Sequence, residues 1–306
     1  MKIFVCVKHV PDSAATIIVH DKIQIDEKIT FLLNPYDEYA VTEAVKLKKS
    51  LIQKGDSSSS AQVHQSNEIE VIAVSLGTSD AEKTVRSAME MGADRGVLIK
   101  TDIRCQDSIT TARALKAAIE QECNERGDLG IIFTGRESID MVGMQTMFRI
   151  GAYFNIPVIN NVFKFTPDIK DGKCLKACVE SLTGGGGKDV YEISLPCVLG
   201  AGRGLNNPAY PTFPDVVKAR KRQIKTVALD DLIKNLINNP IKYLISGSKS
   251  DNSTQTGTNE IRQSGKTEII DLELFAEKRT PKKIGGNNSQ VAKEIVRILK
   301  EEAKVI

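Results

Sequence analysis

The 306-residue sequence has no apolar run that approaches the ~20 residues a helix needs to span a bilayer. Its N-terminal run IFVCV is also too short to form the apolar region of a secretory signal peptide. We therefore expect a chain without a membrane span, located in the cytoplasm or a matrix-like space. A hydrophobic content of 41% beside 26% charged residues is enough to bury a sizeable core, as one large or two small domains.

Cysteine and histidine are few and scattered. The six cysteines include no CxxC pair and form no cluster with the histidines, which argues against a zinc or iron–sulfur site and for reduced thiols in an intracellular protein. Cys174 and Cys178, four residues apart, are explained best as packing positions in a strand or short turn. His9, His20 and His64 are too dispersed to form a recognisable ligand motif.

Basic residues gather in one short run without aromatic residues among them. The run KARKRQIK places Lys218, Arg220, Lys221, Arg222 and Lys225 within eight residues. Single-stranded nucleic acids are usually bound by basic grooves that also carry stacking aromatic side chains, so nucleic-acid binding is not expected. The run is therefore a solvated face or a surface for docking a protein partner.

Two glycine-containing segments lack the spacings of the common nucleotide-binding motifs. In TGGGGKD, Leu182 stands where a P-loop requires glycine and Asp189 where it requires Ser or Thr, so a hairpin turn is expected. The segment 134–151, TGRESIDMVGMQTMFRIG, does not match GxGxxG. It does join the apolar strand LGIIF to a helix, and a helix N-terminus at that sheet edge can hold phosphates. An ordinary strand-to-helix connection remains the alternative.

The pattern of apolar residues predicts an α/β fold with a parallel, doubly wound, Rossmann-like sheet. The runs KIFVCVK, EIEVIAVS, RGVLIK and LGIIFTG read as buried strands. They alternate with amphipathic helices expected over residues 36–49, 80–91 and 108–123. After Pro157 the runs become shorter, 158–165, 173–181, 189–195 and 197–201, and predict antiparallel strands added to the parallel core.

Two polar segments interrupt this organisation. Residues 53–67 are serine-rich and are expected to form a mobile surface insertion. Residues 238–290 are polar and punctuated by SGSKSDNSTQTGTN and GGNN. We therefore expect a nucleotide-binding core over 1–237 and a C-terminal extension over 238–306 that wraps a partner subunit and ends in an amphipathic helix.

Several segments, in the same order, resemble the beta subunit of electron-transfer flavoproteins, the FixA-like family. These segments are MKIFVCVKHVPD, LLNPYDEYAVTEAVKLKK, VIAVSLGTSDAEKTVRSAMEMGADRGVLI, GRESID with Gln145, GLNNPAYPTFPDVVKARKR and the ending AKEIVRILKEEAKVI. The resemblance covers roughly residues 1–50, 69–230 and 290–306.

The resemblance implies an electron carrier rather than an enzyme with its own acid–base machinery. It implies a heterodimer with an alpha subunit that carries FAD, and a nucleotide in this subunit that is AMP or, in electron-bifurcating members, a second FAD that oxidises NADH. It also implies a redox partner of the acyl-CoA dehydrogenase type. A stand-alone nucleotide sensor is the alternative from another class, although it would not explain the resemblance at GLNNPAYPTFP or at the C-terminal ending.

The resemblance also assigns the nucleotide-binding residues. They would be Cys6, Val7, Asn34, Pro35, Tyr36, Asp37, Ser75, Leu76, Asp140, Val142, Gly143, Met144, Gln145, Thr146, Met147, Phe148 and Arg149. Without the resemblance, Asn34 and Pro35 are explained as a turn initiator and Asp37 as a helix N-cap. A residue can fill such a structural role and also bind the nucleotide.

Departures from the family pattern affect the expected nucleotide. Val142 replaces an acidic residue, and Met147 with Phe148 replace a small pair, which predicts a bulkier and more apolar pocket. The aspartate at position 37, by contrast, is similar to the residue found in bifurcating members and favours FAD. The loop from Asp140 to Thr146 would then bind the diphosphate of that FAD.

A second expected site is a protein surface at about residues 195–215. The proline-rich segment GAGRGLNNPAYPTFP would present Leu205 as the anchor for a dehydrogenase, with Asn206, Pro208 and Tyr210 beside it. The alternative is that Leu205 folds back onto the core. Asn207 stands where the family has glutamate, and this lost carboxylate bears on which partner is chosen.

Overall fold

The computed structural model describes residues 1–16, 19–20, 24–25, 29–55, 69–103, 107–170, 172–238 and 283–302. The chain divides into a larger unit, 1–16 with 27–269, and a smaller unit, 17–26 with 270–306. The polar insertion predicted for 53–67 lies outside the described residues from position 56 onward. Most of the extension predicted for 238–290 also lies outside them.

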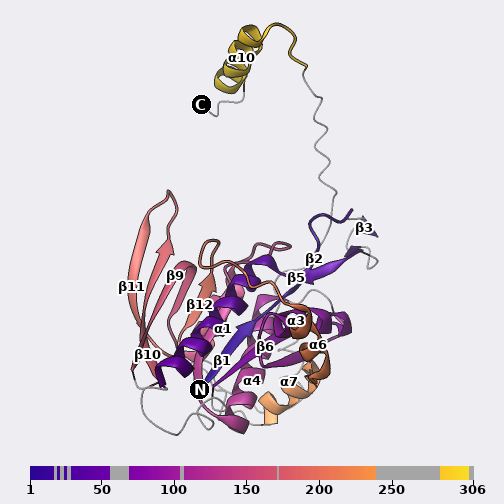
Figure 1. Ribbon diagram of the computed structural model, residues 1–306. Helices are drawn as coiled ribbons and strands as arrows, with labels where there is room; N and C mark the ends of the chain where they lie inside the picture. Colours follow the sequence, from indigo (N-terminus) through magenta and orange to yellow (C-terminus); the bar gives the residue numbers. More distant parts are fainter. Residues whose placement is uncertain are drawn as a thin grey trace, which may run out of the picture. The chain divides into compact units, whose positions relative to one another are not determined.

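Within the described residues, nine strands form the main sheet of the larger unit (Figure 1). Their order across the sheet is β11 (Lys188–Ser194), β10 (Lys173–Leu182), β9 (Val158–Lys170), β12 (Val198–Ala201), β8 (Leu129–Gly135), β1 (Lys2–Cys6), β6 (Glu70–Gly77), β7 (Arg95–Lys100) and β13 (Ile224–Ala228). The pairings from β9 through β13 are parallel, whereas β9–β10 and β10–β11 are antiparallel. The predicted doubly wound sheet with added antiparallel strands is therefore confirmed.

One of the late strands departs from the prediction. The run 197–201 was expected among the antiparallel strands, but β12 lies between β8 and β9 and pairs with both in parallel. All four of its residues are buried. A strand covered by neighbours on both sides and both faces reads as a continuous apolar run, and so short a run does not reveal its direction.

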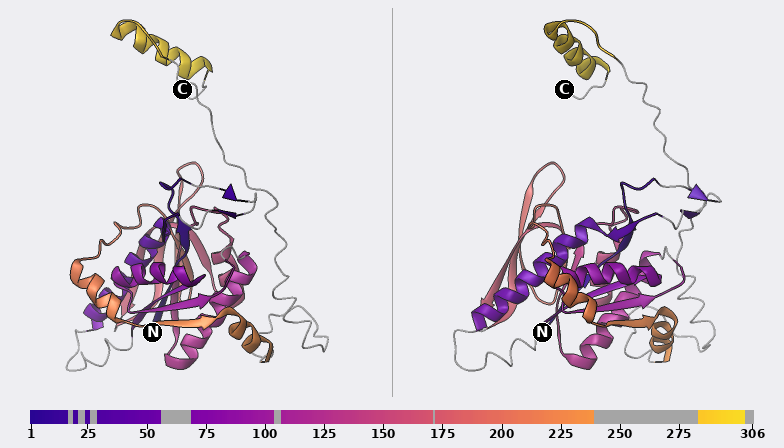
Figure 2. Two further views of the ribbon diagram at one scale, coloured as in Figure 1. Left: turned by 90° about the vertical axis from the view of Figure 1, so that its right-hand side faces the viewer. Right: turned by 45° about the vertical axis from the view of Figure 1, so that its right-hand side comes forward.

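Helices cover both faces of the sheet (Figure 2). One face carries α1 (Pro35–Gly55), α3 (Glu82–Glu90) and α6 (Phe213–Lys221), and the other carries α4 (Ser108–Arg126), α5 (Gln145–Phe154) and α7 (Leu229–Asn238). Side chains of β1 alternate between the two layers: Ile3 and Val5 join the core beneath α1, whereas Phe4 joins the core beneath α4.

The described parts of the remaining segments are small. Strand β2 (His9–Pro11) pairs with β5 (Phe31–Leu33), and a short 3-10 turn η1 (Ser79–Ala81) precedes α3. The glycine run forms the predicted β10–β11 hairpin turn, where Gly185 and Gly186 have φ values of 88° and 84° that favour glycine.

The smaller unit contains a β3 (Val19–His20) and β4 (Gln24–Ile25) pair, the helix α10 (Asn288–Arg297) and a π-helical turn η2 (Ile298–Glu302). The helix predicted at the C-terminus is thus present. It begins with a capping box between Asn287 and Gln290. In the part of the chain that the structure describes, no helix combines the length and apolarity needed to cross a membrane.

The order of the parallel strands creates a switch point beside β1. From β1 the chain runs outward to β6 and β7, then returns to β8 on the opposite side of β1. In doubly wound sheets, ligands bind outside the carboxyl ends of the strands where the winding direction changes. The loops that follow β1, β6 and β8 are therefore the first place to look for a site.

Candidate functional site at the carboxyl edge of the sheet

The loops at the switch point bring together segments that are far apart in the sequence. Val7 and Lys8 follow β1, Ser75 and Leu76 lie near the end of β6, and residues 136–144 connect β8 to α5. Helix α1 begins beside them, because its first turn contacts the loop after β1 and the last residue of β8. The fold thus places the residues expected to bind the nucleotide at one edge of the sheet.

Asp37 joins three of these segments through its buried carboxylate. Its oxygens accept hydrogen bonds from the backbone N–H groups of Lys8 (2.7 Å) and Gly135 (3.0 Å) and from Asn34 Nδ2 (2.9 Å). Only 4% of Asp37 is exposed. A Cβ at Gly135 would overlap Asp37 Oδ1 and Tyr36, so this close approach requires glycine. Asp37 therefore holds the start of α1 against the ends of β1 and β8.

Asn34 holds the loop that follows β8. Its Oδ1 accepts a hydrogen bond from the N–H of Ile139 (3.2 Å), while its Nδ2 also donates to the carbonyl of Glu137 (2.9 Å). The side chain is buried and engages backbone groups about a hundred positions away in the sequence. Asn34 and Asp37 thus brace the loop from beneath through contacts with protein groups.

Lys8 is a residue of this site that sequence reasoning did not identify. Its Nζ lies 2.8 Å from Asp140 Oδ1 and 3.2 Å from Ser138 Oγ. The ion pair closes the loop over the end of β1 and places an ammonium group at the sheet edge. The lysine occurs in the opening motif MKIFVCVKHVPD, but only the tertiary structure shows that it faces Asp140.

The tip of the loop is exposed and conformationally strained. Met141, Val142 and Met144 are exposed, and Val142 and Met144 both have φ near 51°, in the left-handed region. Such a backbone is costly for a β-branched valine, and strain of this kind is concentrated at functional sites. The exposed apolar side chains offer a surface on which a planar ring could pack.

The N-termini of α4 and α5 meet beside this tip. Ser108 Oγ donates to Gln145 Oε1 (3.0 Å), and Arg149 donates to both residues (3.0 and 2.9 Å). Asp107 caps α4 through the N–H groups of Ile109 and Thr110. The N-terminus of α5, which has no side-chain cap, therefore lies beside a guanidinium group, an arrangement suited to phosphate, whereas Asp107 already occupies N–H groups of α4. Ser108 is the second residue that sequence reasoning missed.

Some of the expected site residues are buried in the protein. Met147 is only 3% exposed and packs beneath α5 against Gly200 of β12, whereas its neighbour Phe148 is exposed. Cys6 is also in the core, where burial raises the pKa of its thiol to about 12 and keeps it protonated. Ser75 Oγ is buried and has no hydrogen-bond partner.

The remaining expected residues flank the braced loop. Pro35 is exposed, Tyr36 is half-buried, and the guanidinium group of Arg136 lies 5.4 Å from the centre of the Tyr36 ring. Val7 is buried, Leu76 and Thr146 are partly buried, and Gly143 is exposed. Among the described residues, no cluster of three or more His, Cys, Asp or Glu side chains could hold a metal ion.

Burial raises the pKa of Asp37 to about 7, against the opposite effect of the three hydrogen bonds it accepts. In the native chain the carboxyl group of Asp37 therefore keeps its proton at pH values where the same group in the unfolded chain, with an ordinary pKa near 3.8, has lost its proton. We predict that this group's contribution to the free energy of unfolding is greatest below pH ~4 and falls as the pH rises towards 7. Urea titrations of wild type and Asp37→Asn between pH 4.5 and 7.5 test this, because the variant lacks the titrating group. An equal pH dependence in both would contradict it.

A separate surface lies at residues 202–213, which we call the docking loop. Leu205 is half-buried and packs against the core, and Asn206 and Pro208 are also partly buried. Tyr210 and Phe213, in contrast, are 95% and 80% exposed. A capping box between Thr212 and Asp215 fixes the start of α6 and with it the position of Phe213.

Basic side chains follow this aromatic pair along α6. Lys218, Arg220 and Lys221 lie on exposed positions of α6, which begins at Phe213. Arg222 and Lys225, the other members of the basic run, are tied to the protein instead: Arg222 donates to the carbonyls of Ala93 and Asp94, and Lys225 pairs with Glu122 and Glu125.

Comparison with known proteins gives a consistent result. The family model described as "Electron transfer flavoprotein domain" matches residues 23–232. Three relatives carry the name electron transfer flavoprotein subunit beta. The Bacillus subtilis protein is 28% identical, with both chains fully covered. The Syntrophomonas wolfei protein is 31% identical over 74% of this chain and 80% of its own length, and the mitochondrial protein of Arabidopsis thaliana is 32% identical over 76% and 83%.

Proposed function

The chain belongs to the electron transfer flavoprotein family as a beta subunit, and we propose that it binds an adenine nucleotide at the carboxyl edge of its sheet. The observation that carries this proposal is the N-terminus of α5, which has no side-chain cap and lies beside Arg149 at the switch point. Positive helix ends bind phosphate oxygens, and the adjoining exposed side chains of Met144 and Phe148 offer apolar surface to a base.

The residues present fit such a ligand. Gln145, Thr146 and Arg149 lie in the first turns of α5 and would meet the phosphates, and Lys8 would add a second cation. The hydroxyl group of Ser75, near the end of β6, has no hydrogen-bond partner in the protein and is a further polar group at this edge. Asn34 and Asp37 support the proposal indirectly, because they hold the loop in place through backbone contacts.

We assign no acid–base or nucleophilic step to this subunit. In the proposed heterodimer, the FAD of an alpha subunit supplies the redox chemistry. This chain would hold the nucleotide, support the flavin-bearing subunit and dock an acyl-CoA dehydrogenase or a similar redox partner. The exposed Tyr210 and Phe213, with basic side chains nearby, favour the docking loop for this contact. The extension 238–306 is proposed to lie on the alpha subunit.

The structure bears on the choice between AMP and FAD in this subunit. Asp37 was the residue expected to favour FAD, but the carboxylate of Asp37 accepts hydrogen bonds from three protein donors. The prediction of a bulkier, more apolar pocket rested on Val142, Met147 and Phe148, of which Met147 lies in the core and the other two are exposed. Asp37 and Met147 therefore favour neither nucleotide, and the electron-bifurcating form with NADH as substrate stays an alternative beside the single-path carrier.

We predict that the chain co-expressed with its alpha subunit is purified as a heterodimer with an adenine nucleotide in addition to the alpha subunit's FAD. Denaturation, chromatography and absorbance would identify and count the released nucleotides. Two FAD molecules would support the bifurcating form, and one FAD with one AMP the single-path carrier. A heterodimer that releases only one FAD would contradict nucleotide binding here. A folded monomer that ignores the alpha subunit would favour the stand-alone sensor.

A further inference from the structure

Helix α1 holds the docking loop as well as the proposed nucleotide site. Asn206 Nδ2 donates hydrogen bonds to the carbonyl of Tyr39 (2.9 Å) and to Glu43 Oε2 (2.8 Å). The backbone N–H of Ala209 donates to Thr42 Oγ1 (2.9 Å). These contacts join segments more than 160 residues apart in the sequence. They lie on the helix turns that directly follow Asn34 and Asp37.

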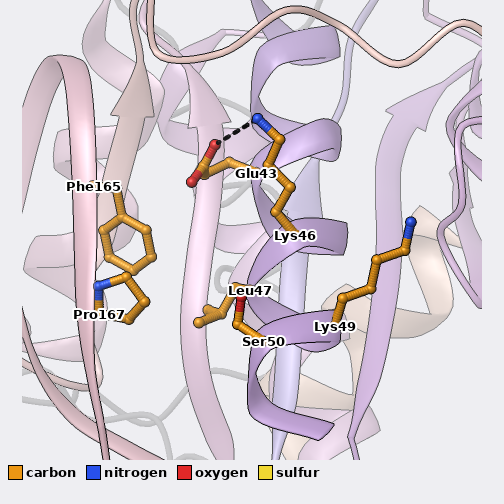
Figure 3. Close-up of a pocket in the computed structure, with 7 residues that line it drawn as sticks. All are labelled: Glu43, Lys46, Leu47, Lys49, Ser50, Phe165 and Pro167. Carbon is orange, nitrogen blue, oxygen red and sulfur yellow. Dashed lines mark ion pairs between the residues drawn. The ribbon is translucent and has the colours of Figure 1, made fainter. Parts of the chain in front are cut away.

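Glu43 is the charged group in this connection. It is only 9% exposed, and burial raises the pKa of its carboxyl group, whereas Asn206 and Lys46 act in the opposite direction. Glu43 lines a cavity of about 340 Å³ between α1 and β9. Figure 3 shows its carboxylate turned towards Lys46. Lys46 Nζ lies 4.0 Å from Glu43 Oε2, so the nearer partner of the carboxylate is Asn206.

The cavity determines how a shortened side chain at position 43 would behave. Its other lining residues are Lys46, Leu47, Lys49, Ser50, Phe165 and Pro167. Since Glu43 borders this open space rather than a closed core, Glu43→Ala enlarges an existing cavity that water can enter. The substitution therefore removes the hydrogen bond to Asn206 without opening a sealed apolar void.

We propose that Glu43 is a positioning residue for partner docking: its hydrogen bond to Asn206 fixes the docking loop so that Tyr210 and Phe213 project outward. This inference rests on the docking role proposed above. A loop held in its binding conformation before the encounter loses less conformational freedom when the partner binds. The clamp is divided between two side chains of α1, because Thr42 holds Ala209 on the far side of Pro208.

The test uses the heterodimer and an acyl-CoA dehydrogenase that transfers electrons to the wild-type protein. Glu43→Ala and Asn206→Ala should each raise the KM for the dehydrogenase about tenfold with kcat unchanged, the loss expected for a hydrogen bond to a charged group. The double variant should be no worse than Asn206→Ala, because that substitution already removes the bond to Glu43 together with the bond to the Tyr39 carbonyl. Glu43→Gln keeps an acceptor and should recover most of the affinity.

Lys46→Ala is the matched control, because it removes the neighbouring charge and leaves the Asn206 bond in place. Calorimetric titration of the dehydrogenase measures the same affinities without turnover, and nucleotide content should be equal in all variants. If Glu43→Ala and Asn206→Ala act additively, or change the KM no more than Lys46→Ala, the positioning role is wrong. A wild-type heterodimer with no saturable dependence on the dehydrogenase would instead refute the docking function on which the inference rests.

Discussion

Replacing Asp37 with alanine is expected to empty the nucleotide site and to lower the free energy of unfolding by about 3 kcal/mol. The substitution leaves the N–H groups of Lys8 and Gly135 and one amide hydrogen of Asn34 without an acceptor in a buried place. Each unsatisfied buried donor is costly, and alanine supplies nothing to replace the carboxylate. The loop braced by Asn34 should then lose its fixed position.

Urea unfolding measures the stability, and the nucleotide content of the purified heterodimer measures the site. Glu38→Ala, one residue further along α1, is the control, because Glu38 lies next to Asp37 and is half-buried. Asp37→Asn should fall between wild type and Asp37→Ala, since its single oxygen can satisfy only part of the three donors. Full nucleotide retention by Asp37→Ala would show that Asp37 does not hold the loop in place.

Local patterns were sufficient to predict the layers of the fold. The alternation of apolar residues in β1 and the helical spacing in α1, α3 and α4 depend on neighbours within a few residues, and the sequence displays these directly. The prediction was wrong for the direction of β12. Four apolar residues fit a parallel or an antiparallel strand equally well, and only the position between β8 and β9 decides between them.

The candidate site was harder to predict, because its contacts join distant segments. The resemblance placed Asn34 and Asp37 near a nucleotide, but it could not show that their side chains engage backbone groups after β1 and β8. Lys8 and Ser108 were missed for the same reason: each acquires a role only through a partner at the loop that follows β8. Charge and residue type alone do not identify such pairs.

The docking loop shows the same limit in a different form. Its prolines and its single leucine predicted Leu205 as the anchor, because an apolar residue in a constrained loop can contact a partner. The structure packs Leu205 against the core and leaves Tyr210 and Phe213 exposed. Only an exposed side chain can meet the partner directly. The sequence alone does not show which of these side chains are exposed.

The double variant Tyr210→Ala with Phe213→Ala is expected to weaken binding of the partner dehydrogenase by about 30-fold or more, while stability and bound nucleotide stay unchanged. Exposed aromatic side chains contribute little to the fold, whereas aromatic residues at the centre of an interface provide much of the binding free energy. The chain presents both rings to solvent beside the basic residues of α6, so a partner with an apolar socket and an acidic rim would bury them.

Steady-state electron transfer at varied dehydrogenase concentration measures this effect as a rise in KM. Leu205→Ala is the informative comparison, because Leu205 packs against the core. If the aromatic pair carries the contact, Leu205→Ala should lower the melting temperature and change the KM only slightly. If Leu205→Ala alone raises the KM and the double variant does not, Leu205 is the anchor, as the family resemblance implies. The docking loop would then have to release Leu205 from the core when the partner binds, and part of the binding free energy would be spent on that rearrangement.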